Sequence, residues 1–225
     1  MDQQLLRELK IQLRRHMNGT TAALMKSLDN PYKANYGISL QHARDIAATH
    51  PLSPDDCIYL WNTQWRDLML IAAAAMLPHD PEPATLLPWV DTIPSVEMTQ
   101  MLPFLLTGRI THAPALAVQL AQRAHTHDLT VAFATLARHI QFNPSPDDAP
   151  AAQSLLTIAL SLPQYTAPQA QALSLLARQC LRSHIALPLI QSLLSLAQSR
   201  PDTQSQLLAT QIADEQSFLS GDNDV

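Results

Sequence analysis

A tryptophan and an aspartate lie two residues apart in the stretch PWVDTI, residues 88–93, of a chain with only 3 tryptophans. Trp89 and Asp91 allow two interpretations. They form the rim of a base-recognition pocket that holds a carboxylate, or they belong to an ordinary packed helix. Residues two apart on a helix point about 200° away from each other, so they cannot share one face. A regular helix here would therefore separate the aromatic ring from the carboxylate.

Two further pairs carry chemistry-bearing side chains. Arg66 and Asp67 open an apolar segment over 64–77. An aspartate suits the start of a helix, and the arginine beside it can bridge to a neighbouring element or hold a phosphate. Trp61 and Trp65 are four residues apart and can share a helix face, unless Asn62 and Thr63 form a helix junction between them. They either pack between helices or stack on a base.

Basic residues surround a loop near the N-terminus. Lys33, Tyr36 and Gly37 precede Ser39, a typical N-cap, and a helix that starts there can bind an anion. The alternative is a solvated basic face with ordinary loop chemistry. The candidate nucleic-acid contacts are Arg14, Arg15, Lys26, Lys33, Tyr36 and Arg66.

The 9 histidines and 2 cysteines form no metal-ligand motif. His125 and His127 face different ways on one helix, and Cys57 and Cys180 have no CxxC partner. Only 4 glycines are present, which argues against a phosphate-cradling loop. We therefore expect no metal, no cofactor and two buried cysteines, as in a cytoplasmic protein.

Composition favours helices. Glycine is rare (4), proline is common (17), and hydrophobic residues make up 47% of 225 residues, with only 5% aromatic. The longest apolar run, Leu68–Leu77, is too short to span a membrane. The net charge of −5 excludes a wholly basic coat protein, but residues 1–45 hold seven basic and four acidic residues. A local basic face is therefore expected at the N-terminus.

The spacing of apolar residues is helical nearly everywhere, beginning with the stripe Leu5, Leu6, Leu9 and Leu13. A second helix is expected to end before Asp29, and others over 40–49, 54–62, 64–77, 82–92, 95–107, 113–126, 128–141, 148–162, 167–183, 186–199 and 202–219. About six antiparallel pairs predict an all-α, HEAT-like helical-repeat solenoid, curved with a concave face; a compact bundle is the alternative. We expect one repeat domain over 1–220, a disordered acidic tail over 221–225, and the clearest internal break at 142–149.

Four stretches occur in a familiar order: RRHMNGTTAALM (14–25), NPYKANYGISLQHARDIA (30–47), YLWNTQWRDLMLIAAAAML (59–77) and LLPWVDTIPSVEM (86–98). In these stretches the chain resembles DNA alkylation repair proteins of the AlkD type, which are bacterial HEAT-like repeat proteins. The resemblance covers the N-terminal half; the C-terminal half matches only as generic helical repeats.

The resemblance implies a concave basic surface that holds duplex DNA. In the glycosylase members it further implies excision of alkylated bases such as 3-methyladenine and 7-methylguanine. Two tryptophans, an aspartate and an arginine there surround the damaged nucleotide. The carboxylate and the aromatic faces stabilise an oxocarbenium-like state, and the arginine holds a phosphate.

This sequence departs from that catalytic set. In the family's site, tryptophan and aspartate are four residues apart on one helix, but Ile93 stands four residues after Trp89. The later tryptophan falls at Leu175, and Arg138 is the candidate for the arginine. We therefore expect the family's fold without its glycosylase chemistry. The candidates for any residual catalytic role are Trp89, Asp91, Asp67 and Arg138.

Three functional hypotheses follow. The first is a DNA-binding repeat protein whose glycosylase chemistry is lost or altered. The second is a non-enzymatic scaffold that holds a protein partner in a concave groove. The third is an active glycosylase whose carboxylate comes from another helix, for instance Asp67 or Glu97.

Overall fold

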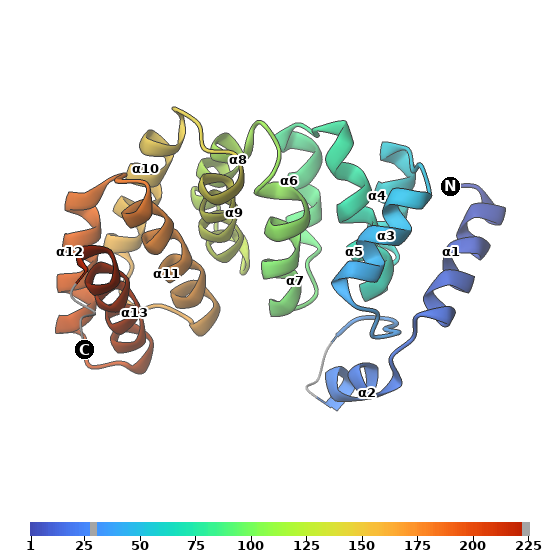
Figure 1. Ribbon diagram of the computed structural model, residues 1–225, viewed down its shortest axis with the longest axis horizontal. Coiled ribbons are helices and arrows are strands. Elements are labelled where there is room, and N and C mark those ends of the chain that lie inside the picture. Colours follow the sequence, from blue (N-terminus) through green and yellow to red (C-terminus); the bar gives the residue numbers. More distant parts are fainter. Residues whose placement is uncertain (28–30, 222–225) are drawn as a thin grey trace. The chain divides into compact units, whose positions relative to one another are not determined.

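The structure is a computed structural model that describes residues 1–27 and 31–221, and this part of the chain is built from helices (Figure 1). It contains thirteen α-helices, one short 3₁₀-helix and one π-helical turn. Within these residues the one β contact is an isolated bridge between Ala34 and Trp65. The predicted all-α class is confirmed.

The chain packs as two compact units, residues 1–106 and 107–225. The first holds α1 (Gln3–Arg15), α2 (Gly19–Ser27), α3 (Leu40–Thr49), α4 (Pro54–Asn62), α5 (Arg66–Met76), the 3₁₀-helix Leu77–His79, α6 (Pro83–Asp91) and α7 (Val96–Leu102). The second holds α8 (Ala113–Ala121), α9 (Asp128–Phe142), α10 (Asp148–Ser161), α11 (Ala167–Arg182), α12 (Leu187–Ser199) and α13 (Thr203–Ser220).

Several helices begin at residues that are typical N-caps, among them the predicted Ser39. The Ser39 side chain accepts a hydrogen bond from the backbone of His42, and the Ser95 side chain does the same for Met98. Ser53 and Thr166 each form a full capping box, with a proline in the first turn that follows. These local signals explain why the predicted helices over 40–49 and 54–62 match α3 and α4.

Helix α5 lies at the centre of the first unit. Ten of its 11 residues are buried, and α3, α4 and α7 pack around it. The alanine run at 72–75 lets neighbouring backbones approach closely. Arg66 and Asp67, at its start, are buried with the apolar residues, so both charges require partners within the protein.

The second unit is a two-layered stack of helices. Helices α8, α10 and α12 pack in succession in one layer, and α9, α11 and α13 in the other. The contacts of α8 with α9 and of α12 with α13 join the layers. This is how helical-repeat proteins bury apolar faces that one helix pair cannot bury alone. The solenoid through the whole chain and its concave face stay predictions.

Two predicted helix ends differ from the structure. The helix expected over 95–107 changes to a π-helical turn at Pro103–Thr107, where proline supplies no N–H to the regular ladder. The helix expected over 113–126 ends at Ala121, and an irregular segment connects it to α9.

The segment 142–149 is the connection between α9 and α10 inside the second unit, whereas the two units meet in sequence at 106 and 107. The single repeat domain over 1–220 stays a prediction. Gly221 ends α13 in a left-handed conformation. The rest of the predicted tail, 222–225, lies outside the described residues, as does the predicted end of the second helix at 28–30.

Candidate functional site

The tryptophan of the PWVDTI stretch lies in the core. Trp89, on α6, is 3% exposed and stacks on the buried ring of Trp61, on α4, with centroids 4.5 Å apart. The indole N–H of Trp61 donates to the Thr92 hydroxyl at 3.0 Å. Asp91, the last residue of α6, is exposed. The structure therefore separates this aromatic ring from this carboxylate, as the helical spacing predicts.

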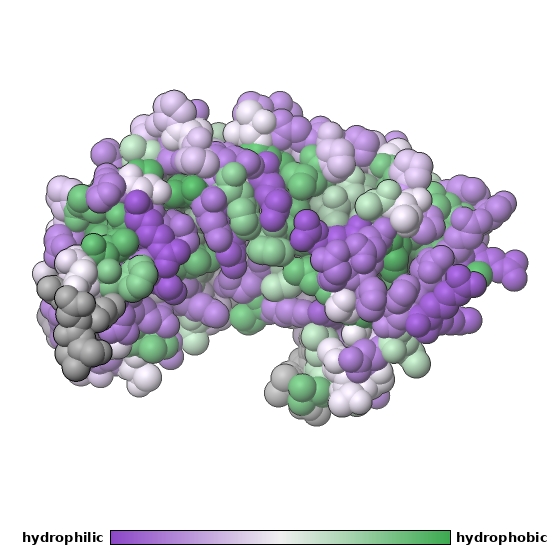
Figure 2. Space-filling model, in the orientation of Figure 1, coloured by the Kyte–Doolittle hydropathy of each residue, from purple (hydrophilic) through white to green (hydrophobic). Residues whose placement is uncertain are grey.

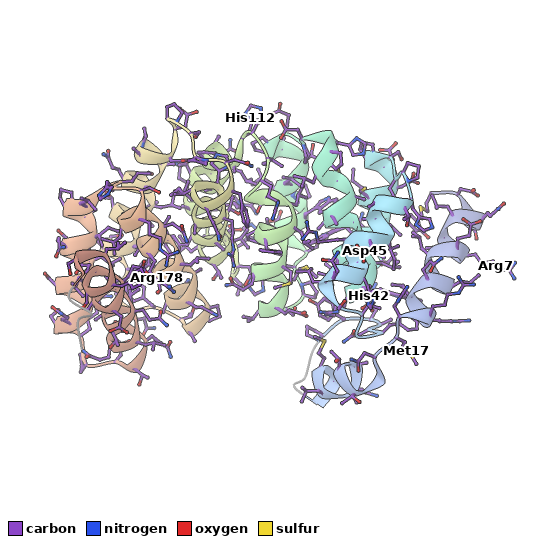
Figure 3. All side chains as sticks on the ribbon, in the orientation of Figure 1. Arg7, Met17, His42, Asp45, His112 and Arg178 are labelled. Carbon is purple, nitrogen blue, oxygen red and sulfur yellow. The ribbon has the colours of Figure 1, made fainter. Side chains whose placement is uncertain are left out.

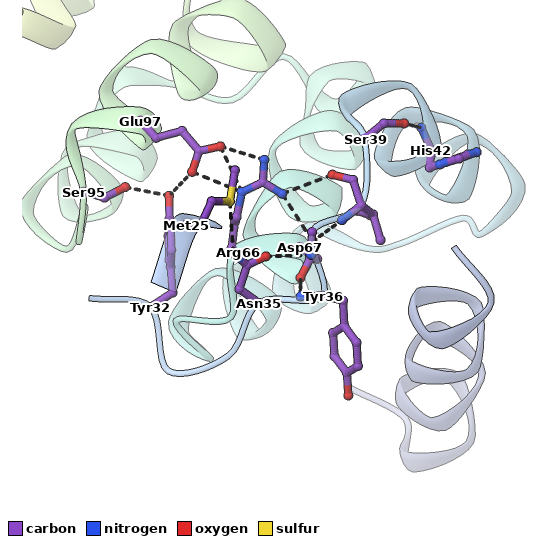
Figure 4. A network of polar contacts seen from close by, with 12 residues as sticks. Met25, Tyr32, Asn35, Tyr36, Ser39, His42, Arg66, Asp67, Ser95 and Glu97 are labelled. Carbon is purple, nitrogen blue, oxygen red and sulfur yellow. Dashed lines mark hydrogen bonds and ion pairs between the residues drawn. The ribbon is translucent and has the colours of Figure 1, made fainter. Parts of the chain in front are cut away.

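Arg66 is the centre of a polar network in the first unit (Figure 4). Its Nε and Nη2 donate to the two carboxylate oxygens of Glu97, on α7, at 2.6–3.1 Å. Its Nη1 donates to the carbonyl oxygen of Ile38 at 3.1 Å. The hydroxyl of Tyr32 donates to Glu97 at 3.2 Å and accepts from Ser95 at 2.7 Å. The Arg66 guanidinium is thus paired within the protein.

Asp67 anchors the loop that precedes α3. Its carboxylate accepts the backbone N–H groups of Tyr36 at 2.6 Å and Ile38 at 3.1 Å, and Arg66 Nη1 lies 3.3 Å away. The side chain is fully buried. Gly37, between the two donors, has φ of 69°, the turn conformation expected of it. Asp67 therefore fixes a loop.

Burial and charge set the protonation states in this network. Burial by itself would lower the pKa of Arg66, but the hydrogen bonds and charge of Glu97 outweigh it and raise that pKa. Burial, and then the nearby charge of Glu97, raise the pKa of Tyr32 above its ordinary value. Arg66 therefore stays charged and Tyr32 stays neutral, as a structural ion pair requires.

The arginine and second aromatic positions implied by the resemblance lie in the second unit. Arg138, on α9, is half-buried and donates to the side-chain oxygen of Gln141 at 2.8 Å. Burial lowers the pKa of Arg138. Leu175, on α11, is half-buried.

Most of the predicted basic contacts face solvent. Arg14 and Arg15, at the end of α1, are exposed, as are Lys26 on α2 and Lys33 in the following loop. Hydrophilic residues cover α1 on the face seen in Figure 2, and Arg7 projects outward from α1 in Figure 3. Tyr36, also predicted, is half-buried.

Two concave surfaces lie beside these cations. The first, which we call the histidine groove, lies between the end of α1 and the starts of α2 and α3. It is lined by Arg15, His16, Met17, Asn18, Gly19, Thr21, Gly37, Ile38, Ser39, Leu40, His42 and Arg66. The second, the lysine groove, is lined by Ala22, Ala23, Lys26, Tyr32, Lys33, Ala34 and Asn35. Among the described lining residues of either groove there is no aspartate or glutamate.

Sequence reasoning missed an aromatic cluster on the first unit. The half-buried ring of Trp65 lies 6.1 Å from Tyr36 by ring centroids, and the Lys10 ammonium sits 4.8 Å from the Trp65 ring. Trp65 precedes α5 rather than sharing a helix with Trp61, so the two indoles do not form a common helix face. Nothing in the local spacing signals this cluster, because its members come from α1, a loop and the start of α5.

Both cysteines lie in the core of the described residues. Cys57 and Cys180 are buried, as predicted, and burial raises the pKa of each thiol to about 12. No cluster of three or more histidine, cysteine, aspartate or glutamate residues is placed to hold a metal in residues 1–27 and 31–221. In the same residues, no helix has the length and apolarity that a membrane crossing needs.

Sequence reasoning also missed a charged contact in the second unit. Arg178 and Arg182, on α11, both donate to the Glu215 carboxylate on α13, at 2.8 and 2.6 Å. The hydrogen bond of Arg182 is the main cause of a lowered Glu215 pKa. This cluster joins two helices of one layer.

Comparison with known proteins gives no further guide to identity: no family model, no curated protein and no solved structure matches this chain. The basic surface of the first unit is therefore the feature from which a function is best argued.

Proposed function

We propose that this protein binds duplex DNA through the basic surface of its first unit and does so without glycosylase chemistry. One observation carries the proposal. Exposed Arg15 lines one groove and exposed Lys26 and Lys33 line another, and the described lining of both grooves contains no carboxylate. The resemblance to alkylation repair proteins of the AlkD type points to the same ligand.

The charge distribution supports a phosphate ligand despite the net charge of −5. Lysine and arginine bind DNA by neutralising backbone phosphates and releasing counterions, which depends on local rather than net charge. All three lysines lie in the first 33 residues, and Lys26 and Lys33 line the same groove.

The absence of catalysis is supported by the positions of the candidate groups. The Trp89 ring is packed against Trp61, so it has no free face for a nucleobase. Asp67 is fully buried and accepts two backbone N–H groups, and Glu97 pairs with Arg66. A carboxylate that stabilises a cationic sugar must reach it, and neither acid is placed to do so. The hypothesis of a relocated catalytic carboxylate thus gains no support from Asp67 or Glu97.

The test is duplex affinity measured by fluorescence anisotropy across a salt series. Wild type should bind at low salt, and K26Q/K33Q should weaken binding and reduce the steepness of the salt dependence. Loss of two phosphate contacts lowers the slope of log affinity against log salt by about 1.8. The matched control is R109Q/R178Q, which removes two charges from the second unit and should leave affinity unchanged.

Two results would contradict the proposal. Absence of duplex binding by wild type at low salt refutes DNA binding, and an equal loss in both double variants refutes its location. Release of methylated purines from alkylated DNA by wild type refutes the non-catalytic part.

A protein ligand is the second candidate, and one observation favours it. Leu207, Gln211, Asp214 and Phe218 recur along one face of α13, and Leu207 and Phe218 are 49% and 65% exposed. Exposed apolar side chains on one helix face are typical of contact surfaces. A stoichiometric protein complex that forms without DNA and is lost in L207S/F218S would favour this candidate over DNA binding.

A further inference from the structure

The histidine groove holds a pair of imidazole rings in contact. His16 follows α1 and His42 lies in the first turn of α3, and their ring centroids are 4.2 Å apart at an interplanar angle of 30°. His16 is exposed and His42 is half-buried, so solvent reaches the pair. Figure 3 shows His42 close to Met17, at the point where the chain leaves α1.

The charged side chains that line the groove beside this pair are basic. They are Arg15, from α1, and Arg66, from α5, and Arg66 is already paired with Asp67 and Glu97. The lining residues from the start of α2 and from the 37–39 loop carry no titratable group. On α3, the nearest carboxylate in sequence is Asp45, which accepts a hydrogen bond from Gln41 and does not line the groove. Arg15 is therefore the cation of the groove that is exposed beside the two imidazoles.

We infer that the histidine groove binds a phosphate group, held by Arg15 and by imidazole N–H groups of His16 and His42. If the phosphate belongs to a DNA backbone, the inference rests on the proposed function and names one contact between the protein and the duplex. The groove volume of about 630 Å³ accommodates a phosphate with an attached sugar. The first turns of α2 and α3 also border the groove, but Asn18 and Ser39 already cap them, so the cations carry the inference.

The contacts set the size of the expected effect. An imidazole N–H can donate to a phosphate oxygen, and an arginine N–H donates a charge-assisted hydrogen bond to it. With two imidazole contacts to one anion at a solvent-accessible site, their loss should weaken binding about tenfold.

The experiment compares wild type with H16Q/H42Q and with a matched control, H112Q/H184N, which removes two exposed histidines of the second unit. Duplex affinity is measured by anisotropy at pH 5.5 and constant ionic strength. In parallel, the ring C–H signals of His16 and His42 are followed by NMR during titration with duplex, with inorganic phosphate and with a nucleoside 5′-monophosphate. The inference expects equal affinity in wild type and in the control, and a loss of about tenfold in H16Q/H42Q.

The outcomes separate the inference from the proposed function. If duplex DNA binds equally well to wild type and H16Q/H42Q at pH 5.5, the phosphate site is refuted and DNA binding stands. If duplex DNA does not bind but the small phosphates shift the His16 and His42 signals, DNA binding is refuted and the site takes its phosphate from another source. If neither duplex nor small phosphate perturbs these signals, the inference is overturned.

Discussion

Replacement of Asp67 by asparagine tests whether this carboxylate is a structural anchor. Asp67→Asn keeps the size of the side chain but removes its charge and turns one acceptor oxygen into a donor NH₂ group. The carboxylate accepts the backbone N–H groups of Tyr36 and Ile38, so one of these donors would face another donor inside the protein. Arg66 would also lose one of its two acidic neighbours.

The expected loss follows from these contacts. A hydrogen bond to a charged group contributes about 1.5–3 kcal/mol to stability. A buried donor that is left without an acceptor costs about 1–3 kcal/mol. Glu97 remains to neutralise Arg66, so the full cost of about 3–5 kcal/mol for breaking a buried ion pair is not reached. We expect the free energy of unfolding of the first unit to fall by about 3 kcal/mol.

Urea denaturation followed by tryptophan fluorescence measures this change, because Trp61, Trp65 and Trp89 all lie in the first unit. The matched control is Asp45→Asn, an exposed aspartate on α3 that should change stability by less than about 0.5 kcal/mol. If D67N and D45N unfold within about 1 kcal/mol of each other, the assignment of Asp67 as the anchor of this loop is refuted.

Three further predictions concern packing and charge. Gly37→Ala should destabilise the first unit by more than about 1 kcal/mol, since φ is 69° and a Cβ would lie 2.5 Å from a backbone oxygen. Gly221→Ala, with φ of 77° and open space, serves as its control in urea denaturation. Trp89→Ala should cost about 3–5 kcal/mol in the same assay, because it leaves a cavity beside a buried ring; a loss below about 1 kcal/mol contradicts the stack. Burial, opposed by nearby Asp148, lowers the pKa of His139, so the unfolded chain binds that proton more readily. Thermal unfolding followed by circular dichroism should therefore show stability falling as pH drops below about 6.5, and His139→Gln should reduce this pH dependence. An unchanged pH profile in His139→Gln contradicts the prediction.

Much of the helical framework could be predicted because its signals are local. Ser39, Ser53 and Thr166 each cap the helix that follows them, and prolines in the first turns reinforce these starts. Where a predicted helix differs from the structure, the difference also has a physical cause. Pro103 removes an N–H from the ladder, and a π-helical turn replaces the end of the predicted helix.

The candidate site was only partly predictable. The exposure of Arg15, Lys26 and Lys33 agrees with their charge, which keeps such side chains in water. Arg66 was open to two interpretations in sequence, and the structure places it in an ion pair with Glu97 on another helix. The pairing of His16 with His42 gave no signal at all, since the rings come from separate elements.

The sequence by itself determines that this protein is helical, where most helices begin, and that its positive charge is concentrated near the N-terminus. These properties depend on neighbours within a few residues and on composition. Only the tertiary structure decides that Trp89 stacks on Trp61, that Glu97 holds an arginine 31 residues away, and that two histidines meet in a groove. Such contacts depend on how helices pack, and packing joins side chains whose separation along the chain carries no periodic signal.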